Sequence, residues 1–221
     1  MIRAVIFDLD GTLFDRPTSV RRCIEAQYNG FPQILGGVPE QRYVSRFLEL
    51  DEHGYVPKEV VYLQLANELS LPSGSSDVLY MDFYARYHRY AIGFPELHST
   101  LQRLSAQSLS LAIITNGGEA HQRATIRALG IEPYFDVILI SEAVGIRKPD
   151  PRIFALACEW LHVALSEAVF MGDHPSVDIE GARSSGMRSV WRRARHWGEC
   201  AGADAVIEDL SALPSVLALW A

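Results

Sequence analysis

Short apolar runs alternate with helix-like segments along most of the chain. From residue 90 onward the apolar runs fall at 109–115, 135–140, 168–173, 188–191 and 203–209. The first run is followed by EAHQRATIRALG and the second by PDPRIFALACEWLHV, both with apolar residues at helical spacing. Continuously apolar strands that alternate with helices are typical of a parallel sheet covered by helices on both faces. The pattern therefore predicts an α/β fold with a Rossmann-like parallel sheet.

One further apolar run, residues 2–8, is assigned to the same sheet but stands apart from the others. Residues 16–90 carry helical patterns separated by turn signals such as GGVP and LPSGSS, and they contain no convincing strand. We therefore expect an all-helical domain over residues 16–90. It would be inserted into a core domain made of residues 1–15 and 91–221.

Composition and charge narrow the class of protein. The chain has 221 residues, of which 48% are hydrophobic and 21% charged, and its net charge is −7. Such values are typical of globular proteins, and the length suffices for a core domain with a smaller insertion. Affinity for a phosphate backbone needs clustered cations, so we expect no nucleic-acid partner. No apolar stretch approaches the roughly 20 residues that span a bilayer, so we expect no membrane partner either.

The three cysteines, Cys23, Cys158 and Cys200, are widely spaced and form no CxxC pair. This spacing suggests neither a disulfide framework nor a zinc site, and we expect reduced thiols. The opening residues MIRAVIF do not have the length of a signal-peptide apolar region. The sequence therefore predicts a cytoplasmic protein.

Two acids stand where the first apolar run ends, in AVIFDLDGTLFD. Alternate residues of a strand point the same way, so we expect Asp8 and Asp10 to share one face. Like charges held so close together oppose ionisation, which destabilises the fold unless something compensates. A bound cation or a catalytic role would explain the pair.

Polar residues also follow the other predicted strands. Thr115 and Asn116 follow the run 109–115, Lys148 follows the next run in GIRKPDP, and Asp173 follows Gly172. Ligands of open parallel sheets bind beyond the carboxyl ends of the strands. Four strand ends thus bring acids, a hydroxyl and a lysine to one edge, which indicates a functional site.

The motifs DLDGT, TN, KPDP and GDHPSVD occur in this order along the chain. They resemble the four successive motifs of the haloacid dehalogenase (HAD) superfamily. The helical insertion after the first motif resembles the C1-type cap of subfamily I. The resemblance spans the chain, with motifs from 8 to 178, and is greatest to phosphatases of small molecules. It implies a small phosphorylated metabolite as substrate and Mg²⁺ as cofactor.

The resemblance also implies a role for each motif residue. Asp8 would be the nucleophile that forms an aspartyl-phosphate, and Asp10 the acid and then the base that exchanges the protons. Lys148 would hold Asp8 and the phosphoryl group together. The phosphoryl oxygens would be bound by Thr12, Thr115, Asn116 and Gly117. The magnesium ion would be held by Asp8, the backbone carbonyl of Asp10, Asp173 and Asp178.

Other functions of the same superfamily remain alternatives. A haloacid dehalogenase needs neither an acid two residues after its nucleophile nor metal-binding acids, so Asp10 and Asp173 argue against it. A phosphonatase has a small apolar residue in the place of Asp10. A phosphomutase typically has valine where Thr12 stands, and it stays open because the cap decides which hydroxyl accepts the phosphoryl group. A non-catalytic metabolite-binding module is disfavoured because the whole set of motif residues is present.

Each motif residue also has a simpler interpretation. Thr115 and Asn116 are compatible with a helix N-cap, Lys148 with a surface lysine before a turn, and Asp178 with a cap of the following helix. His174 stands where the family usually has a small hydroxyl residue. Three interpretations are open for His174: it contacts a metal-bound water, it contacts the cap domain, or it occupies an exposed loop position.

Overall fold

The computed structural model describes residues 1–220, which form two compact units. One unit, called here the sheet unit, consists of Met1–Asp15 and the chain from Gly93 onward. The other, the helical unit, is Arg16–Ile92. None of the helices described has the length and apolar character needed to cross a membrane.

Within the residues described, the sheet unit contains one sheet of six parallel strands. They are β1 (Ala4–Phe7), β2 (Ser110–Thr115), β3 (Val137–Ile140), β4 (Ala168–Gly172), β5 (Arg188–Arg192) and β6 (Ala205–Ile207). Their order in the sheet is β3-β2-β1-β4-β5-β6, and every neighbouring pair is parallel. The predicted α/β fold with a Rossmann-like sheet is confirmed.

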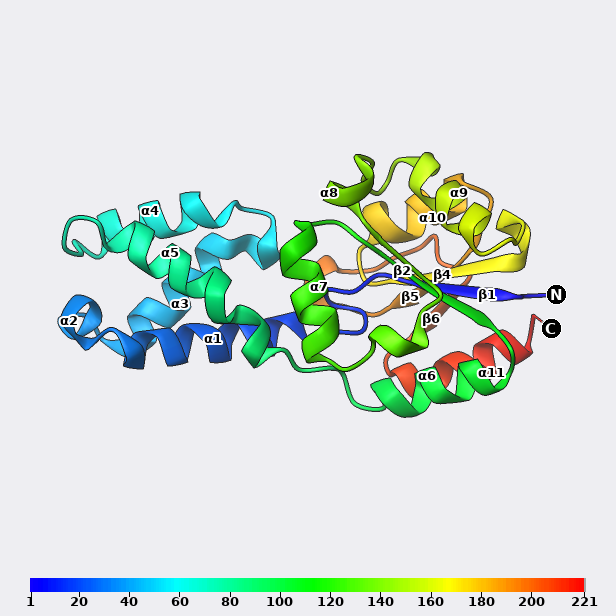
Figure 1. Ribbon diagram of the computed structural model, residues 1–221, viewed down its shortest axis with the longest axis horizontal. Coiled ribbons are helices and arrows are strands. Elements are labelled where there is room, and N and C mark those ends of the chain that lie inside the picture. The colour runs from blue at the N-terminus through cyan, green and yellow to red at the C-terminus, as the bar shows by residue number, and fades with distance from the viewer. Residues whose placement is uncertain (221) are drawn as a thin grey trace. The chain divides into compact units, whose positions relative to one another are not determined.

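Helices cover both faces of this sheet (Figure 1). They are α6 (Leu97–Ala106), α7 (Glu119–Ala128), α8 (Ser141–Val144), α9 (Pro151–Trp160), α10 (Gly181–Ser184) and α11 (Leu213–Ala218). Figure 1 shows α9 and α10 on one side of the strands and α6 and α11 on the other. The chain moves from β1 through β2 to β3 in one direction and then from β4 to β6 in the other. Right-handed crossovers therefore place the connecting helices on opposite faces.

The central strand β1 explains the apolar run at the start of the chain. Its four residues, Ala4–Phe7, are fully buried because helices cover both faces of the sheet. β1 lies between β2 and β4, at the point where the strand order reverses. Such a switch point is where ligands of open α/β sheets bind. The residues that follow β1 and β4 are therefore neighbours at the binding edge.

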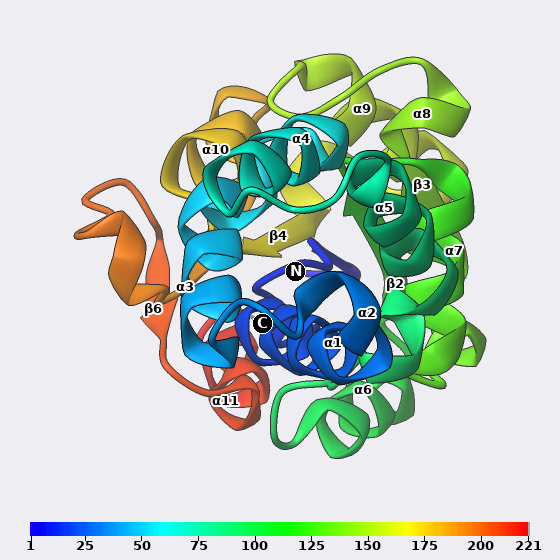
Figure 2. The same cartoon turned by 90° about the vertical axis from the view of Figure 1, so that its left-hand side faces the viewer.

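The helical unit is a ring of four helices with one short helix added. Its members are α1 (Arg16–Gly30), α2 (Pro32–Leu35), α3 (Glu40–Asp51), α4 (Lys58–Glu68) and α5 (Ser75–Arg86). Going around the ring, α1 packs on α3, α3 on α4, α4 on α5, and α5 on α1 (Figure 2). The rings of Phe47, Tyr62 and Phe83 meet in its core, with centroids 5.2 to 6.2 Å apart.

A buried glutamine of α1 joins this helix to the other three helices of the ring. Oε1 of Gln27 accepts hydrogen bonds from the hydroxyls of Tyr43 and Tyr62, at 2.7 and 2.8 Å. Its Nε2 donates to the carbonyl oxygen of Leu79 and to Oδ2 of Asp82, at 2.8 and 3.0 Å. Both ends of the amide are thus satisfied, as a buried polar group requires.

A buried carboxylate in the helical unit is shared by two cations. Arg16 donates to both oxygens of Asp51, at 2.8 and 3.2 Å, and Nζ of Lys58 lies 2.6 Å from Oδ1. Burial alone would raise the pKa of Asp51, but Arg16 and Lys58 together hold it below its ordinary value. We call Asp51, Arg16 and Lys58 the Asp51 cluster.

The chain leaves and re-enters the sheet unit at adjacent points. Phe14 forms an antiparallel bridge with Gly93, and the backbone N–H of Phe94 donates to the carbonyl oxygen of Leu13 at 3.1 Å. The segment Arg16–Ile92 is therefore inserted at the open end of a short two-stranded stem.

Candidate active site

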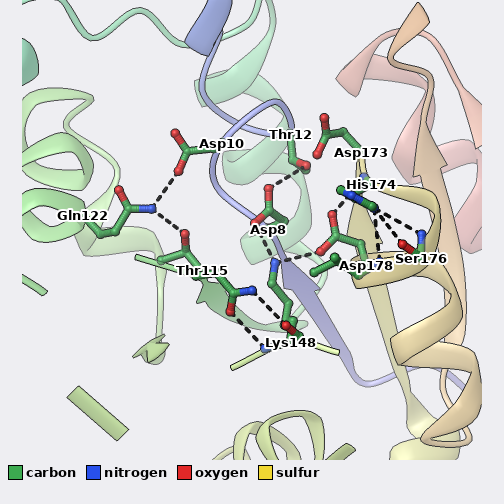
Figure 3. A network of polar contacts seen from close by, with 12 residues as sticks. Asp8, Asp10, Thr12, Thr115, Gln122, Lys148, Asp173, His174, Ser176 and Asp178 are labelled. Atoms are coloured by element: carbon green, nitrogen blue, oxygen red, sulfur yellow. Dashed lines mark hydrogen bonds and ion pairs between the residues drawn. The ribbon is translucent and has the colours of Figure 1, made fainter. Parts of the chain in front are cut away.

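Asp8 is the first residue after the central strand and is held from two sides. Its Oδ1 lies 2.6 Å from Nζ of Lys148, and its Oδ2 accepts a hydrogen bond from the Thr12 hydroxyl at 3.2 Å (Figure 3). The backbone N–H of Asp8 donates to Met171 on β4 at 2.8 Å. The residue is 6% exposed. A strand, a turn and a buried lysine thus fix its position.

Asp10 lies on the turn that follows the strand. The strand expected over residues 2–8 ends at Phe7, so strand alternation does not reach Asp10. The carbonyl oxygen of Leu9 instead accepts three backbone N–H groups and curls the chain. Figure 3 shows Asp10 on the side of Gln122, whose Nε2 donates to Oδ2 of Asp10 at 2.7 Å. The two acids therefore have different partners.

Lys148 is buried and forms two ion pairs. Its Nζ lies 2.6 Å from Oδ1 of Asp8 and 2.8 Å from Oδ1 of Asp178. The side chain of Asn116 holds the lysine backbone from both directions, donating to its carbonyl oxygen and accepting from its N–H, each at 2.9 Å. The interpretation of Lys148 as a surface lysine is wrong. The N-cap position of α7 is occupied by Gly118, so Asn116 is a brace for Lys148 and not a helix cap.

Three buried carboxylates meet beside Lys148. Oxygen atoms of Asp8, Asp173 and Asp178 lie within 4.8 Å of one another. Two glycines make room for them. A Cβ atom at Gly11 would lie 2.4 Å from Oδ2 of Asp173, and one at Gly172 would lie 2.4 Å from Cβ of Asp178. Gly11 also has φ +80°, a conformation that disfavours any side chain. We call the three acids and Lys148 the site cluster.

The site cluster carries more negative than positive charge. Burial raises the pKa of Asp8 to about 7, with Lys148 opposing the rise and neighbouring carboxylates adding to it. The pKa of Asp173 is raised well above its ordinary value by burial and by Asp178 and Asp8. Burial would lower the pKa of Lys148, but Asp178 and Asp8 hold it above the usual range. Three oxygen ligands with excess charge in a buried position fit a hard divalent cation such as Mg²⁺.

Residues outside the four motifs support Asp173. The indole Nε1 of Trp191 donates to the backbone oxygen of Asp173 at 2.6 Å, and that of Trp197 to its Oδ2 at 3.4 Å. On the other side, Nη1 of Arg192 donates to the carbonyl oxygen of Gly11 at 3.0 Å. These three side chains lie in or after β5 and belong to none of the four motifs.

His174 caps the segment that carries Asp178. Its Nδ1 accepts the backbone N–H groups of Ser176 and Val177, both at 3.2 Å, and its ring lies 4.2 Å from that of Trp197. The backbone N–H of His174 donates to Oδ2 of Asp178 at 3.0 Å. The structure gives His174 a helix N-cap role, which is not among the three interpretations left open for it. The carboxylate of Asp178 accepts the backbone N–H of His174 and also forms an ion pair with Lys148. The interpretation of Asp178 as a simple helix cap is therefore incomplete.

Of the four residues expected to bind phosphoryl oxygens, Thr115, Asn116 and Gly117 lie at the end of β2, whereas Thr12 lies on the turn after β1 and gives its hydroxyl hydrogen to Asp8. Thr115 is buried, and its Oγ1 accepts from Nε2 of Gln122 at 2.6 Å. The backbone N–H of Gly117 donates to the Ser141 hydroxyl at 3.0 Å, so it already has a protein partner. Gln122 lies outside the four motifs, which therefore do not reveal it. Its only signal in the sequence is its place on the face of α7 that also buries Thr125 and Ile126, where a polar side chain must find a partner.

Comparison with known proteins identifies the family. The model of the haloacid dehalogenase-like hydrolases matches residues 5–192, and the chain therefore belongs to this family. The resemblance inferred from the four motifs is confirmed.

The relatives of this chain include named phosphatases. Glyceraldehyde 3-phosphate phosphatase of Methanopyrus kandleri is 30% identical over 211 residues, covering 86% of this chain and 83% of that protein. Phosphoserine phosphatase of Thermus thermophilus is 40% identical over 109 residues, covering 49% of this chain and 43% of the relative. These relatives confirm the prediction of an enzyme in the phosphatase branch of the family.

A solved structure with another activity is also similar. The crystal structure of a 2-haloacid dehalogenase from Pseudomonas syringae is 33% identical, has a TM-score of 0.68 and covers 100% of both chains. The same fold thus carries both chemistries, and the site residues must distinguish them.

Proposed function

We propose that the protein is a magnesium-dependent phosphatase that hydrolyses a small phosphorylated metabolite through an aspartyl-phosphate on Asp8. The observation that carries the proposal is the position of Asp8. It is a buried carboxylate at the end of the central strand, held by Thr12 and Lys148, next to two further acids. A second carboxyl group, that of Asp10, lies on the following turn with a separate partner.

In the first step, an oxygen of Asp8 attacks phosphorus and the bond from phosphorus to the leaving alcohol breaks. Asp10 gives its proton to the leaving oxygen. In the second step, a water oxygen attacks phosphorus and Asp10 takes a proton from that water. The bond between phosphorus and Asp8 breaks, which releases phosphate and restores the carboxylate.

The remaining motif residues bind and balance charge. Lys148 faces Asp8 and would compensate negative charge on the transferred group. The hydroxyl of Thr115 and the backbone donors of Asn116 and Gly117 would bind phosphoryl oxygens, for which Gly117 must leave Ser141. Thr12 holds the second oxygen of Asp8 and thereby orients the first.

Asp8, Asp173 and Asp178 would hold the magnesium ion through their carboxylates, and Asp10 through its backbone carbonyl. When bound, Mg²⁺ offsets the charge of the phosphate dianion against these acids and polarises its oxygens. The gathering of three buried acids around a single lysine supports this assignment.

The substrate class rests on the relatives and on the helical unit. The named relatives act on glyceraldehyde 3-phosphate and phosphoserine, two small phosphate monoesters. We assign the choice of substrate to the helical unit, as the cap domain inserted between β1 and β2. The proposal keeps a small metabolite, and no nucleic acid or membrane, as the partner, and it keeps the cytoplasmic location expected from the sequence.

Two other activities are alternatives to phosphate ester hydrolysis. The likeness to a dehalogenase favours halide release as the second candidate. Against it stand Asp10 and the clustered Asp173 and Asp178, which a metal-free displacement at carbon does not need. A phosphomutase differs only in the hydroxyl that takes the phosphoryl group from Asp8.

The test measures phosphate release from 4-nitrophenyl phosphate and from a panel of metabolite monophosphates, with Mg²⁺ or with chelator. We expect magnesium-dependent turnover that Asp8→Asn abolishes and that Asp77→Asn, on an exposed position of the helical unit, leaves unchanged. Halide release from 2-haloacids without phosphate release would establish the dehalogenase instead. Turnover that survives Asp8→Asn would show that Asp8 is not the nucleophile.

Magnesium binding has a readout that does not depend on turnover. Both Trp191 and Trp197 donate hydrogen bonds to Asp173. We expect Mg²⁺ to change tryptophan fluorescence in a saturable way in the wild-type protein and not in Asp173→Asn. An unchanged spectrum at millimolar Mg²⁺ would argue against a metal at this position.

A further inference from the structure

Gln122 lies on α7, outside the four motifs, and touches two residues of the site at once. Its Nε2 is 2.7 Å from Oδ2 of Asp10 and 2.6 Å from Oγ1 of Thr115 (Figure 3). The residue is 3% exposed. An amide nitrogen carries two hydrogens, so each of these oxygens receives one. Gln122 therefore joins the turn after β1 to the end of β2.

These two hydrogen bonds constrain where the hydrogens of both partners lie. Oδ2 of Asp10 accepts from an N–H, so it is the acceptor oxygen of that carboxyl group, and a proton on Asp10 belongs on Oδ1. Oγ1 of Thr115 also accepts from Gln122, so its own hydroxyl hydrogen points to another acceptor. A hydroxyl has one hydrogen and two lone pairs, which makes both roles compatible.

We propose that Gln122 is a positioning residue for phosphoryl transfer. It fixes Oδ1 as the oxygen of Asp10 that exchanges protons with the substrate, and it makes the Thr115 hydroxyl a donor to a phosphoryl oxygen. This inference rests on the proposed phosphatase function and names a residue that the four motifs do not contain.

The surrounding chain is built to admit this side chain. A Cβ atom at Gly117 would lie 3.1 Å from Cγ and 3.2 Å from Cδ of Gln122, closer than ordinary contacts. The backbone N–H of Gln122 donates to Gly118 at 3.0 Å, in the first turn of α7. Gly117 of the TNGG segment thus leaves the space that the glutamine occupies.

A purely structural glutamine looks different in the same protein. Gln27 is also buried, but its amide binds two tyrosine hydroxyls, a backbone carbonyl and Asp82, all within the helical unit. Gln122 donates instead to Asp10 and Thr115. In the proposed mechanism Asp10 exchanges a proton with the substrate, and Thr115 binds a phosphoryl oxygen. The partners, and not burial alone, indicate the role.

The role predicts a dependence on the leaving group. 4-Nitrophenolate leaves without help from an acid, whereas the benzyl alkoxide must receive a proton as it leaves. The two phosphate esters are otherwise similar in size. The value of kcat/KM reports the steps up to loss of the alcohol, and kcat also includes hydrolysis of the aspartyl-phosphate.

The experiment compares Gln122→Met with the wild-type protein on benzyl phosphate and 4-nitrophenyl phosphate, with Mg²⁺. Methionine keeps the length of the side chain and removes both hydrogens. We expect kcat/KM to fall about 100-fold on benzyl phosphate and less than about tenfold on 4-nitrophenyl phosphate. On 4-nitrophenyl phosphate kcat should fall more than kcat/KM, because Asp10 also takes the proton of the water that hydrolyses the aspartyl-phosphate. Slow hydrolysis of this intermediate should produce a burst of nitrophenolate.

Two further variants complete the test. Gln102→Met makes the same change at an exposed glutamine of α6 and should leave both substrates unaffected. Gln122→Asn keeps an amide but shortens its reach to Asp10 and Thr115, and should change the two substrates in the same unequal way, to a smaller extent. It also keeps the proposal testable if Gln122→Met fails to fold, which the unfolding midpoint by tryptophan fluorescence would show.

The outcomes are distinct. An equal loss on both substrates in a folded variant, or no loss on either, overturns the positioning role. Phosphate release from neither substrate by the wild-type protein overturns the proposed function, and the inference falls with it. Unequal loss with the burst supports both.

Discussion

The protein contains two buried clusters of charge with opposite balance. In the Asp51 cluster one carboxylate is shared by Arg16 and Lys58, and its pKa is lowered. In the site cluster Asp8, Asp173 and Asp178 gather around Lys148, and the pKa values of Asp8 and Asp173 are raised. In the first arrangement the cations outnumber the carboxylate, and their ion pairs with Asp51 stabilise the helical unit. The second is left with excess negative charge, which a cation and a phosphoryl transfer can use.

The largest expected difference comes from removing one lysine from each cluster. Lys148→Met should lower the free energy of unfolding by about 3–5 kcal/mol without metal, because it leaves buried carboxylates unpaired. Lys58→Met should lower it by about 1 kcal/mol, because Arg16 still binds both oxygens of Asp51.

Urea unfolding in chelator measures both variants. All four tryptophans, at positions 160, 191, 197 and 220, belong to the sheet unit, so fluorescence follows that unit. Far-UV circular dichroism follows the helices of the other unit as well. Equal losses in the two variants would show that the clusters do not differ in the way described.

Removing one acid should have opposite effects on the two clusters. Asp51→Asn removes the charge of the carboxylate that Arg16 and Lys58 both contact, and should destabilise the protein by about 3 kcal/mol. Asp173→Asn relieves repulsion with Asp178 and Asp8 and should stabilise the metal-free protein by about 1 kcal/mol. Thermal unfolding in chelator gives the sign of the stability change for each variant. A loss of stability in Asp173→Asn would contradict repulsion among the acids of the site cluster.

Magnesium should stabilise one cluster only. At 100 times its dissociation constant, Mg²⁺ should add about 2.7 kcal/mol to the free energy of unfolding of the wild-type protein. Asp51→Asn should retain this increment, and Asp173→Asn should lose most of it. The increment is measured as the rise in unfolding midpoint with Mg²⁺ concentration; a rise of the same size in both variants would place the metal elsewhere.

The smallest effect is the pH dependence of the Asp51 cluster. The folded pKa of Asp51 lies below that of the unfolded chain, about 3.9. Its contribution is therefore complete above the unfolded pKa and is lost as the pH falls through the folded pKa. Between about pH 5 and pH 3 the wild-type protein should lose more stability than Asp51→Asn. Parallel pH profiles of the two proteins would show that Asp51 does not contribute in this way.

Much of the sheet and of the site edge could be predicted from the sequence. Strands buried on both faces must be apolar throughout, which marks β1, β2 and β4 clearly. The carboxyl ends of parallel strands lie at one edge, so the strand pattern is enough to place Asp8 and Asp173 at the same edge, whereas their contact depends on β1 and β4 being neighbours. The same pattern places Asp10 less well, because the strand ends at Phe7 and the chain has already turned at Leu9.

Contacts between distant segments could not be predicted in the same way. Gln122 and Asp10 are 112 residues apart, and the pattern of α7 shows only that Gln122 faces inward. The pairing of Lys58 with Asp51 depends on how α3 and α4 pack, which the sequence of neither helix specifies. The donation from Trp197 to Asp173 depends on the path of an irregular segment after β5.

The stem formed by Phe14 and Gly93 affects how readily the sheet unit tolerates an insertion. Opposite residues of an antiparallel pair lie about 5 Å apart, a gap that a tight turn can close. The helical unit therefore adds little loop-closure entropy to the folding of the sheet unit, although it separates β1 from β2 along the chain. Insertions at such a junction can be exchanged, lengthened or removed while the strand order is kept. With the role proposed for the helical unit, a change made at this stem would alter the choice of substrate and leave the strand order as it is.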